Sequence, residues 1–408
     1  MIIRKEYMRQ LLNWKDEHVI KVVTGIRRCG KSTLLKQYQE HLRESGVEDR
    51  RIIYINFEEE LEYNHLLNDL ALYNYIKERL VTDKTTYIFL DEIQKVPDFE
   101  KVVDSLYAKD HTDIYITGSN AHMLSGDLAT LLTGRYVEIS MLPLSFREYF
   151  DATTDMTPED AFRSYLQNGG MPYIAVMNQT PEKIDTYLEG IYNTVIVRDI
   201  EERQYRKAAT EDKRKITDIT LLKTIARYLA SVVGSPVSTK SVADYFVSNG
   251  RKISPNTIND YMEALEESFI FYPVERFDIV GKQLLKTNKK WYIVDLGIRN
   301  HILPRQNYDF GFSLENIVYF ELLRRGYKVH IGKHASSEID FVAQKEGTLT
   351  YIQVTADMLD EKTFHREMLP LRSIKDNYEK IVLTADIFTT GNYDGIKVQN
   401  LLDWLITA

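Results

Sequence analysis

A short segment near the start of the chain carries glycines, a lysine and a serine at a spacing that suits phosphate binding. The segment Gly25-Ile-Arg-Arg-Cys-Gly30-Lys31-Ser32 fits the pattern G-x-x-x-x-G-K-[ST]. Glycines let backbone N–H groups turn toward a phosphate, and a helix N-terminus adds positive partial charge. Lys31 is expected to reach the β- and γ-phosphates of a nucleotide, and Ser32 to offer a hydroxyl to Mg²⁺. The residues expected to contact this ligand are Gly25, Arg28, Cys29, Gly30, Lys31, Ser32 and Thr33.

A second chemical group stands at the end of another apolar run. Tyr87-Ile-Phe-Leu90 reads as a buried strand, and Asp91 and Glu92 follow it directly. A carboxylate at that strand end is expected to hold Mg²⁺ through water, and Glu92 to polarise an attacking water. The chain has no Asn-Lys-x-Asp, the usual guanine reader, so the pattern favours ATP over GTP. The alternative for Asp91 and Glu92 is a solvated strand end.

Two further positions are candidates for the hydrolytic step. Strand Ile114–Thr117 is followed by Gly118-Ser119-Asn120, and Asn120 is our candidate to sense the γ-phosphate and orient water, with Thr117 and Ser119 as alternatives. An ordinary Gly-Ser-Asn turn is the competing interpretation. Arg135 precedes the last predicted strand, where a guanidinium can neutralise transition-state charge within its own chain or from a neighbouring subunit. A surface salt bridge is the alternative role for Arg135.

Composition limits the classes of protein that this chain can be. It has 408 residues, with 52 Lys and Arg against 60 Asp and Glu, which gives a formal net charge of −8. That balance argues against a general basic coat for nucleic acid, and 44% apolar residues exclude a largely disordered chain. Cys29 is the only cysteine, so an internal disulfide and a multi-cysteine zinc cluster are excluded; within the loop it is a small filler or an oxidation-sensitive thiol. No apolar run is long enough to cross a bilayer, so we expect a cytoplasmic protein without a membrane partner.

Hydrophobic patterns predict the elements that position these residues. In the first 150 residues, short strands alternate with helices, which indicates an α/β fold with a parallel sheet of the P-loop NTPase type. Charged helical patterns follow, then three helices and a hairpin, and finally a helix–strand–strand–strand–helix–strand order. The predicted divisions are an ATPase core at 1–145, a helical lid or linker at 146–215, a winged-helix-like domain at 216–300 and a nuclease-like domain at 301–408.

Several motifs in this order resemble one family across nearly the whole chain. They are Ile3-Arg-Lys-Glu-Tyr7, Val23-Thr-Gly-Ile-Arg-Arg-Cys-Gly-Lys-Ser-Thr33, Phe89-Leu-Asp-Glu-Ile-Gln94, Thr117-Gly-Ser-Asn120 and Pro143-Leu-Ser-Phe-Arg-Glu-Tyr149. The chain thereby resembles the predicted AAA+-superfamily ATPases of bacteria and archaea that carry a C-terminal domain of unknown function. The resemblance implies an AAA+ core, a winged-helix middle and a restriction-endonuclease-like C-terminal fold. By motif position, it assigns ATPase roles to Lys31, Ser32, Asp91 and Glu92.

The middle segment offers mixed signals for DNA binding. Asn256, Thr257 and Asn259 lie where a winged helix would read bases. The carboxylates that follow on the same predicted helix would repel phosphates; they are Asp260, Glu263, Glu266 and Glu267. Double-stranded DNA therefore stays one candidate partner beside a protein partner and a homo-oligomer.

The last segment has some of the residues of a metal-dependent nuclease and lacks others. Glu315 on the first helix and Asp340 on a strand are present. The next strand carries Gln353 and Thr355 where a nuclease of this type needs Glu and Lys. These departures favour a domain that is catalytically degenerate, so nuclease activity is not expected.

Three functions follow from these patterns. The first is an Mg²⁺-dependent ATPase that couples its nucleotide state to a C-terminal partner- or DNA-binding module. The second is a slow-turnover nucleotide switch that regulates a protein partner. The third is an ATP-gated DNA nuclease, which the missing lysine disfavours.

Overall fold

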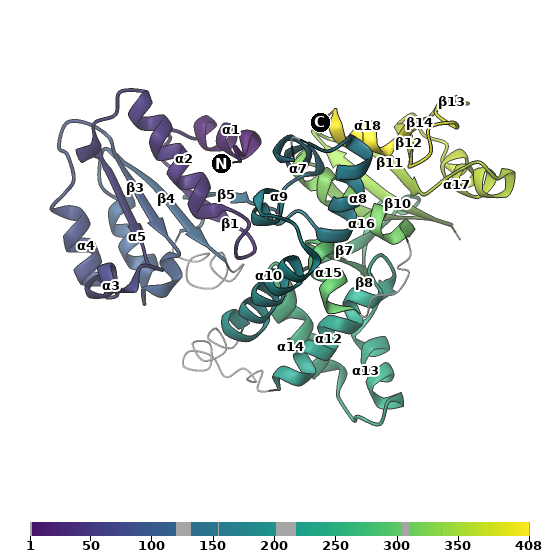
Figure 1. Ribbon diagram of the computed structural model, residues 1–408, viewed down its shortest axis with the longest axis horizontal. Helices are drawn as coiled ribbons and strands as arrows, with labels where there is room; N and C mark the ends of the chain where they lie inside the picture. Colours follow the sequence, from purple (N-terminus) through teal and green to yellow (C-terminus); the bar gives the residue numbers. More distant parts are fainter. Residues whose placement is uncertain are drawn as a thin grey trace. The chain divides into compact units, whose positions relative to one another are not determined.

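The computed structural model describes residues 2–119, 132–153, 155–200, 218–303, 310–335 and 337–407. The chain divides into two compact units (Figure 1). The first comprises Met1–Pro143 with Glu267–Phe269, and the second comprises Leu144–Glu266 with Ile270–Ala408. The first division falls two residues before the end of the predicted ATPase core.

The first unit is an α/β fold with a parallel sheet, as the sequence predicts. Its described strands are β1 (Ile20–Thr24), β2 (Ile52–Asn56), β3 (Thr86–Asp91), β4 (Thr112–Gly118) and β5 (Tyr136–Ser140). Its helices are α1 (Lys5–Asn13), α2 (Lys31–Glu44), α3 (Glu60–Tyr63), α4 (Asp69–Lys77) and α5 (Phe99–Tyr107), with 3-10 turns at Asp49–Arg51, Asn64–Leu66 and Ile93–Lys95. These strands pair in parallel in the order β2-β3-β4-β1-β5.

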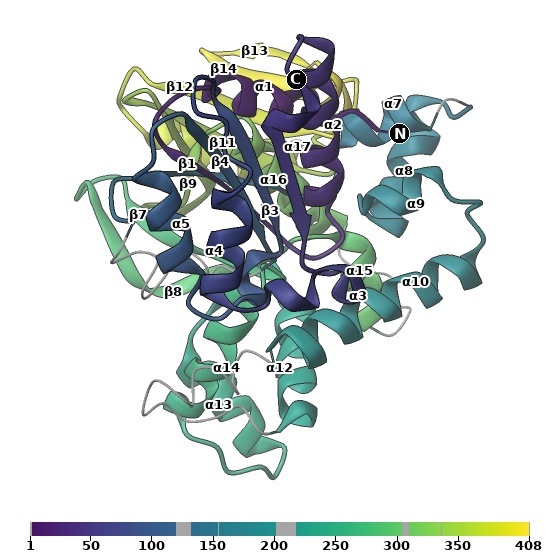
Figure 2. The ribbon, with the colours of Figure 1, turned by 90° about the vertical axis from the view of Figure 1, so that its left-hand side faces the viewer.

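Helices cover both faces of this sheet, which explains why its strands are continuous apolar runs. On one face, α4 and α5 pack against alternate strand residues such as Val22, Ile88 and Ile116. On the other face, the ring of Tyr38 from α2 meets the rings of Phe89 and Tyr115. Figure 2 shows α2 and the α4–α5 pair on opposite sides of the strands.

The strand order brings the predicted chemical groups to one edge. All five strands run in the same direction, so their carboxyl ends lie together. Thr24, the last residue of β1, is aligned with Gly118 of β4, and β4 in turn pairs with β3, which ends at Asp91. Strand β4 therefore stands between the phosphate-binding segment and the carboxylates.

The second unit contains the remaining described helices. They are α7 (Phe146–Ala152), α8 (Pro158–Asn168), α9 (Pro172–Val176), α10 (Pro181–Asn193), a π-helical turn at Thr194–Asp199, α12 (Ile219–Ser231), α13 (Thr239–Ser248), α14 (Pro255–Glu267), α15 (Leu296–Ile302), α16 (Phe310–Arg324), α17 (Glu361–Ser373) and α18 (Leu401–Ile406). Its strands are β6 (Pro236–Val237), β7 (Phe271–Asp278), β8 (Gln283–Ile293), β9 (Lys328–His334), β10 (Ser337–Lys345), β11 (Thr348–Thr355), β12 (Glu379–Thr384), β13 (Gly391–Tyr393) and β14 (Ile396–Asn400).

One mixed sheet contains strands from both of the predicted domains 216–300 and 301–408. The described strands of the second unit pair in the order β13-β14-β12-β11-β10-β9-β7-β8-β6. Strand β7 of the hairpin pairs in parallel with β9, with Arg276 aligned to Ile331. The hairpin β7–β8 therefore belongs to the same sheet as the C-terminal strands.

A buried carboxylate ties the helical segment of this unit to the start of α15. Asp295 accepts hydrogen bonds from the N–H of Ile298 at 3.1 Å and from the N–H of Gly170 at 2.6 Å. Burial raises the pKa of Asp295 to about 6. Gly169 has φ +80°, and a Cβ there would lie 2.1 Å from the Asp295 carboxylate. The turn after α8 is thus shaped to admit this side chain.

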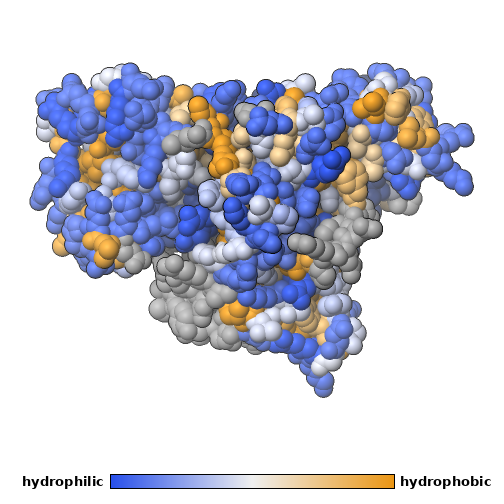
Figure 3. Space-filling model, viewed as in Figure 1, coloured by the Kyte–Doolittle hydropathy of each residue, from blue (hydrophilic) through white to orange (hydrophobic). Residues whose placement is uncertain are grey.

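The surface carries small groups of apolar side chains among polar ones. Hydrophilic residues cover most of the face in Figure 3, and exposed apolar residues such as Leu61 and Phe388 occur in both units. Among the described residues, no helix has the length and apolar character needed to cross a membrane.

Candidate nucleotide-binding site

The loop between β1 and α2 has the backbone that phosphate binding requires. Gly25 has φ +141°, and a Cβ at this position would lie 2.0 Å from the carbonyl oxygen of Met141, so only glycine fits. Gly30 has φ +109° and immediately precedes Lys31, the first residue of α2. The first N–H groups of a helix lack acceptors within the helix, so this end can bind an anion.

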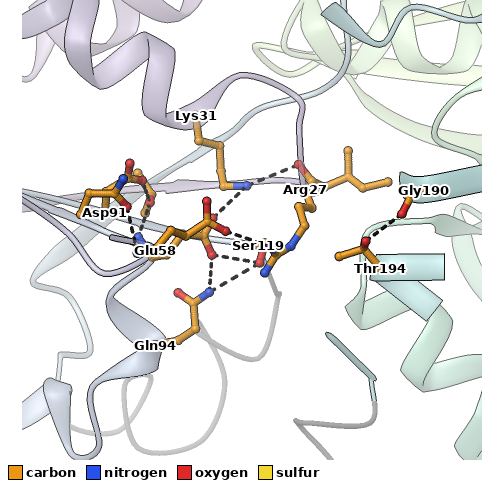
Figure 4. A network of polar contacts seen from close by, with 12 residues as sticks. Arg27, Lys31, Glu58, Asp91, Gln94, Ser119, Gly190 and Thr194 are labelled. Carbon is orange, nitrogen blue, oxygen red and sulfur yellow. Dashed lines mark hydrogen bonds and ion pairs between the residues drawn. The ribbon is translucent and has the colours of Figure 1, made fainter. Parts of the chain in front are cut away.

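Lys31 lies buried inside this loop. Its Nζ donates to the carbonyl oxygens of Gly25 at 3.0 Å and Ile26 at 3.4 Å, and lies 3.5 Å from Oε1 of Glu92 (Figure 4). Burial lowers the pKa of Lys31, but Glu92, Cys29 and Asp91 together outweigh that effect, so the net pKa is raised. The lysine is therefore a cation held between the loop carbonyls and the glutamate.

Asp91 ends β3 and is fully buried. Its Oδ1 accepts from the hydroxyl of Thr117 at 2.5 Å, and its Oδ2 accepts from the hydroxyl of Tyr54 at 3.0 Å. The hydroxyl of Ser32 also hydrogen-bonds to Asp91. Burial raises the pKa of this carboxyl, and these hydrogen bonds act in the opposite direction. Three hydroxyls thus fix one carboxylate beside the start of α2.

Glu92 leaves the strand in a left-handed conformation, with φ 55° and ψ 45°. A non-glycine residue in that region is strained by about 1 kcal/mol or more. Its N–H donates to Oγ1 of Thr117 at 2.9 Å, and its Oε2 accepts from Gln94 and Ser119. Burial alone would raise the pKa of Glu92, yet Lys31 and the hydrogen bond from Gln94 outweigh it, and the pKa is lowered. The glutamate is held as an anion.

The donor set fits Mg²⁺ bound together with a nucleotide. Ser32 offers a hydroxyl and Asp91 a carboxylate, and the two are in hydrogen-bond contact. Mg²⁺ usually keeps several waters and takes one or two protein oxygens plus substrate phosphates. Among the described residues, no group of three or more His, Cys, Asp and Glu side chains is arranged to hold a metal ion by itself. A metal here would therefore need the phosphates and water to complete its ligands.

The remaining predicted loop residues differ in how far they are buried. Cys29 is fully buried, and burial raises the pKa of its thiol. Arg28 has φ 68° and is exposed, as is Thr33 on α2. Next to them, Arg27 forms a 2.9 Å ion pair with Glu58. The thiol is thus packed inside the loop, while Arg28 and Thr33 face solvent.

Two predicted catalytic positions lie away from this cluster or outside the described residues. Asn120 lies outside the part of the chain that the structure describes. The backbone oxygen of Arg135 accepts from the N–H of Ile20, the first residue of β1, so Arg135 lies at the amino-terminal edge of the sheet. Its side chain pairs with Asp104. The structure therefore brings together Lys31 with Glu92, and Ser32 with Asp91, but it separates Arg135 from the site of its own chain.

Sequence reasoning missed the roles of Tyr54 and Gln94. Gln94 lies two residues after Glu92 in the segment Phe89–Gln94, so its presence beside the carboxylates was visible. Its contact depends on the turn that follows Glu92. Tyr54 comes from β2, and its contact with Asp91 depends on the pairing of β2 with β3. A single sequence signals neither contact.

The strand order and the site define a fold, and comparisons with known proteins show which families the chain is similar to. A parallel sheet with order β2-β3-β4-β1-β5, a glycine loop and two carboxylates at one edge are the features of the P-loop NTPase fold. Residues 17–150 match the family described as AAA domain, and residues 159–309 match a domain of unknown function (DUF8612).

Two relatives extend over most or all of the chain. A protein of Haemophilus influenzae, described as an uncharacterized protein, is 39% identical over 411 residues, which cover 100% of this chain and 99% of that protein. The uncharacterized protein MJ1544 of Methanocaldococcus jannaschii is 30% identical over 377 residues, covering 88% and 79% of the two chains. The chain belongs to the same protein family as these relatives.

One solved structure has a similar fold. The Walker-type ATPase PABY2304 of Pyrococcus abyssi superposes with a TM-score of 0.51 at 16% sequence identity. The match covers 74% of this chain and 96% of that one. At this identity the likeness concerns the fold alone.

Proposed function

We propose that this protein binds ATP with Mg²⁺, hydrolyses it, and uses the nucleotide state to control a partner that binds its C-terminal half. The observation that carries the proposal is the buried Lys31–Glu92 ion pair at the mouth of a glycine loop. An ammonium and a carboxylate that are both removed from water cost free energy, so a site that keeps them has a use for both charges.

In this proposal, different residues bind the phosphates, hold Mg²⁺ and orient the attacking water. The backbone of Gly25–Ser32 surrounds the phosphates, and Lys31 moves its amine from the carbonyls of Gly25 and Ile26 to phosphate oxygens. Ser32 and Asp91 would hold Mg²⁺, which would offset the charge of the phosphates. Glu92, freed from Lys31, accepts a hydrogen bond from the attacking water and orients it.

The slow-turnover switch remains the second candidate, and one observation favours it. In this structure both oxygens of Glu92 have protein partners, since Oε1 faces Lys31 and Oε2 faces Gln94 and Ser119. Hydrolysis requires that at least one of these contacts is exchanged for water. A protein whose exchange is slow would bind nucleotide tightly and turn it over slowly until a partner raises the rate.

For the C-terminal half, a protein partner fits better than DNA. The order α12–β6–α13–α14–β7–β8 supports the winged-helix interpretation. However, the amide of Asn259 on α14 donates to Glu263 of the same helix at 2.7 Å. Arg251, which precedes α14, pairs with Asp218. Groups that would read bases and bind phosphate are therefore engaged with carboxylates. An acidic recognition helix repels DNA, so we propose that this face binds a protein.

Nuclease activity is not part of the proposal. Lys290 on β8 bonds to Glu315 at 2.9 Å and to Glu338 at 2.8 Å, and Asp340 accepts from the N–H of Val354 at 2.8 Å. The carboxylates that a nuclease would use for Mg²⁺ thus already have protein partners. Nicking of supercoiled plasmid that disappears in Asp340→Ala would overturn this view.

The test is ATP turnover by the purified full-length chain with Mg²⁺, with and without double-stranded DNA. Lys31→Ala should abolish nucleotide binding, and Glu92→Gln should bind nucleotide while slowing turnover by roughly 100-fold or more. Lys109→Ala, which removes an exposed lysine after α5, is the matched control and should behave as wild type. Undiminished turnover in Glu92→Gln would remove that residue from its assigned role.

A further inference from the structure

Two neutral donors converge on one oxygen of Glu92. Nε2 of Gln94 donates to Oε2 at 2.5 Å, and Oγ of Ser119 donates to the same Oε2 at 3.1 Å. Gln94 also reaches Oγ of Ser119 at 3.5 Å, so the three side chains form one group, with Gln94 and Ser119 labelled in Figure 4. The other oxygen, Oε1, is the one that faces Lys31.

The two oxygens of Glu92 therefore have partners of different kinds. Oε1 has a cationic partner that must leave when a phosphate takes Lys31, because one ammonium cannot serve both anions equally. Oε2 has neutral partners whose positions are set by the protein: Gln94 lies in the 3-10 turn Ile93–Lys95, and Ser119 directly follows β4. When the lysine leaves, Gln94 and Ser119 still hold the carboxylate.

We propose that Gln94 and Ser119 are positioning residues for ATP hydrolysis, which hold Oε2 of Glu92 so that Oε1 is presented to the attacking water. The inference rests on the proposed function. It adds Gln94 to the site and gives Ser119, an alternative candidate for orienting water, the task of holding Oε2 of Glu92. Neutral donors suit the task because they orient an anion without neutralising it, so Oε1 keeps its ability to accept a proton.

The backbone around Glu92 supports a fixed carboxylate rather than a mobile one. Its left-handed conformation is maintained by the bond from its N–H to Thr117 at 2.9 Å. Thr117 and Ser119 are both at the end of β4, so the backbone and the side chain of Glu92 are tied to the same strand end. Orientation of a catalytic base to within a few tenths of an ångström needs this kind of support.

The experiment compares Gln94→Met and Ser119→Ala with wild type by ATP binding calorimetry and by kcat at saturating ATP. Methionine keeps the length of glutamine and removes both amide hydrogens. We expect ATP affinity to stay within about threefold of wild type and kcat to fall roughly 10-fold or more in each variant, since a hydrogen bond to a charged group is lost. Ser119→Thr, which keeps the hydroxyl, should restore most of kcat.

Two readouts separate positioning from a merely structural role. A positioning residue lowers kcat while ATP affinity stays near that of wild type, and the conservative variant Ser119→Thr recovers the rate. Gln10→Met is the matched control, because Gln10 donates to Glu6 on α1, outside the nucleotide site. That variant should keep the wild-type affinity and rate.

The outcomes are distinct from those that test the proposed function. If wild type hydrolyses ATP and Glu92→Gln does not, the proposed function stands; wild-type kcat in Gln94→Met and Ser119→Ala would then overturn the positioning inference alone. If wild type binds ATP but never hydrolyses it, hydrolysis and the positioning inference both fail, while the switch remains.

Discussion

The ammonium of Lys31 lies 3.5 Å from Oε1 of Glu92, and the side chains of both residues are about 95% or more removed from solvent. Each is the other's counter-charge. Binding of a phosphate by Lys31 would separate the two groups, so their contact would set a free-energy cost on nucleotide binding.

Breaking this pair should destabilise the first unit. Lys31→Met leaves the Glu92 carboxylate buried without its cation, and we expect a loss of about 3 kcal/mol in the free energy of unfolding. Adding Glu92→Gln to Lys31→Met should recover most of that loss, because no buried charge remains. Urea unfolding of the four proteins in this double-mutant cycle measures the coupling. Additive effects would mean that the pair has no energetic coupling.

Gly25→Ala should abolish nucleotide binding without unfolding the chain. The new Cβ would lie 2.0 Å from the carbonyl oxygen of Met141, so the loop must move away from β5. Gly46→Ala is the control, since Gly46 also has positive φ, +87°, but has nothing within 4 Å of its Cβ position. Calorimetric titration with ATP should show binding in Gly46→Ala and none in Gly25→Ala. Retained affinity in Gly25→Ala would show that the loop tolerates the shift.

Arg135 should act from a neighbouring subunit if it acts in hydrolysis at all. It lies at the edge of the sheet opposite the carboxyl ends of the strands, where it pairs with Asp104. Mixing Arg135→Ala with Lys31→Ala subunits should then restore part of the ATPase activity that each lacks alone, because one subunit supplies the intact loop and the other the arginine. A mixture that stays inactive would assign Arg135 to the surface ion pair.

Asp295 should make the second unit less stable as pH rises from about 4 to 6. Its pKa is about 6 in the folded chain and about 3.9 in an unfolded one, so between these values the folded state binds more protons. Stability gained from protonated Asp295 is therefore full below pH 4 and lost as pH passes 6, by about 3 kcal/mol.

The measurement is chemical unfolding of wild type and Asp295→Asn across this pH range. The variant should lack this slope between pH 4 and 6, while Asp185→Asn, which alters an exposed aspartate on α10, should keep it. Parallel stability profiles for wild type and Asp295→Asn would contradict the assigned shift.

The local parts of the site were predictable from sequence, and the contacts across strands were not. Gly25, Lys31, Ser32 and Asp91 lie where the motif places them, because a loop between a strand and a helix is encoded by neighbouring residues. The hydrogen bonds from Gln94 and Ser119 to Glu92 join residues that follow two different strands. The spacing of these residues in the sequence therefore does not reveal the contacts.

Elements were predicted with the same limits. The predicted strands Tyr87–Leu90 and Ile114–Thr117 lie within β3 and β4, which are each two or three residues longer. In the second unit, the sequence indicated a missing lysine at Thr355. Lys290 of β8 forms an ion pair with Glu315 of α16, a contact that depends on how this helix packs against the strand.

The two sheets also differ in when they become complete as the chain is synthesised. Every described strand of the first sheet precedes residue 141, whereas the second sheet needs strands from Pro236 to Asn400. At about 5–20 residues per second, roughly 13–50 seconds of translation separate the two completion points. A nascent chain can therefore assemble the strands around Lys31 and Asp91 on the ribosome well before its C-terminal sheet has all its parts.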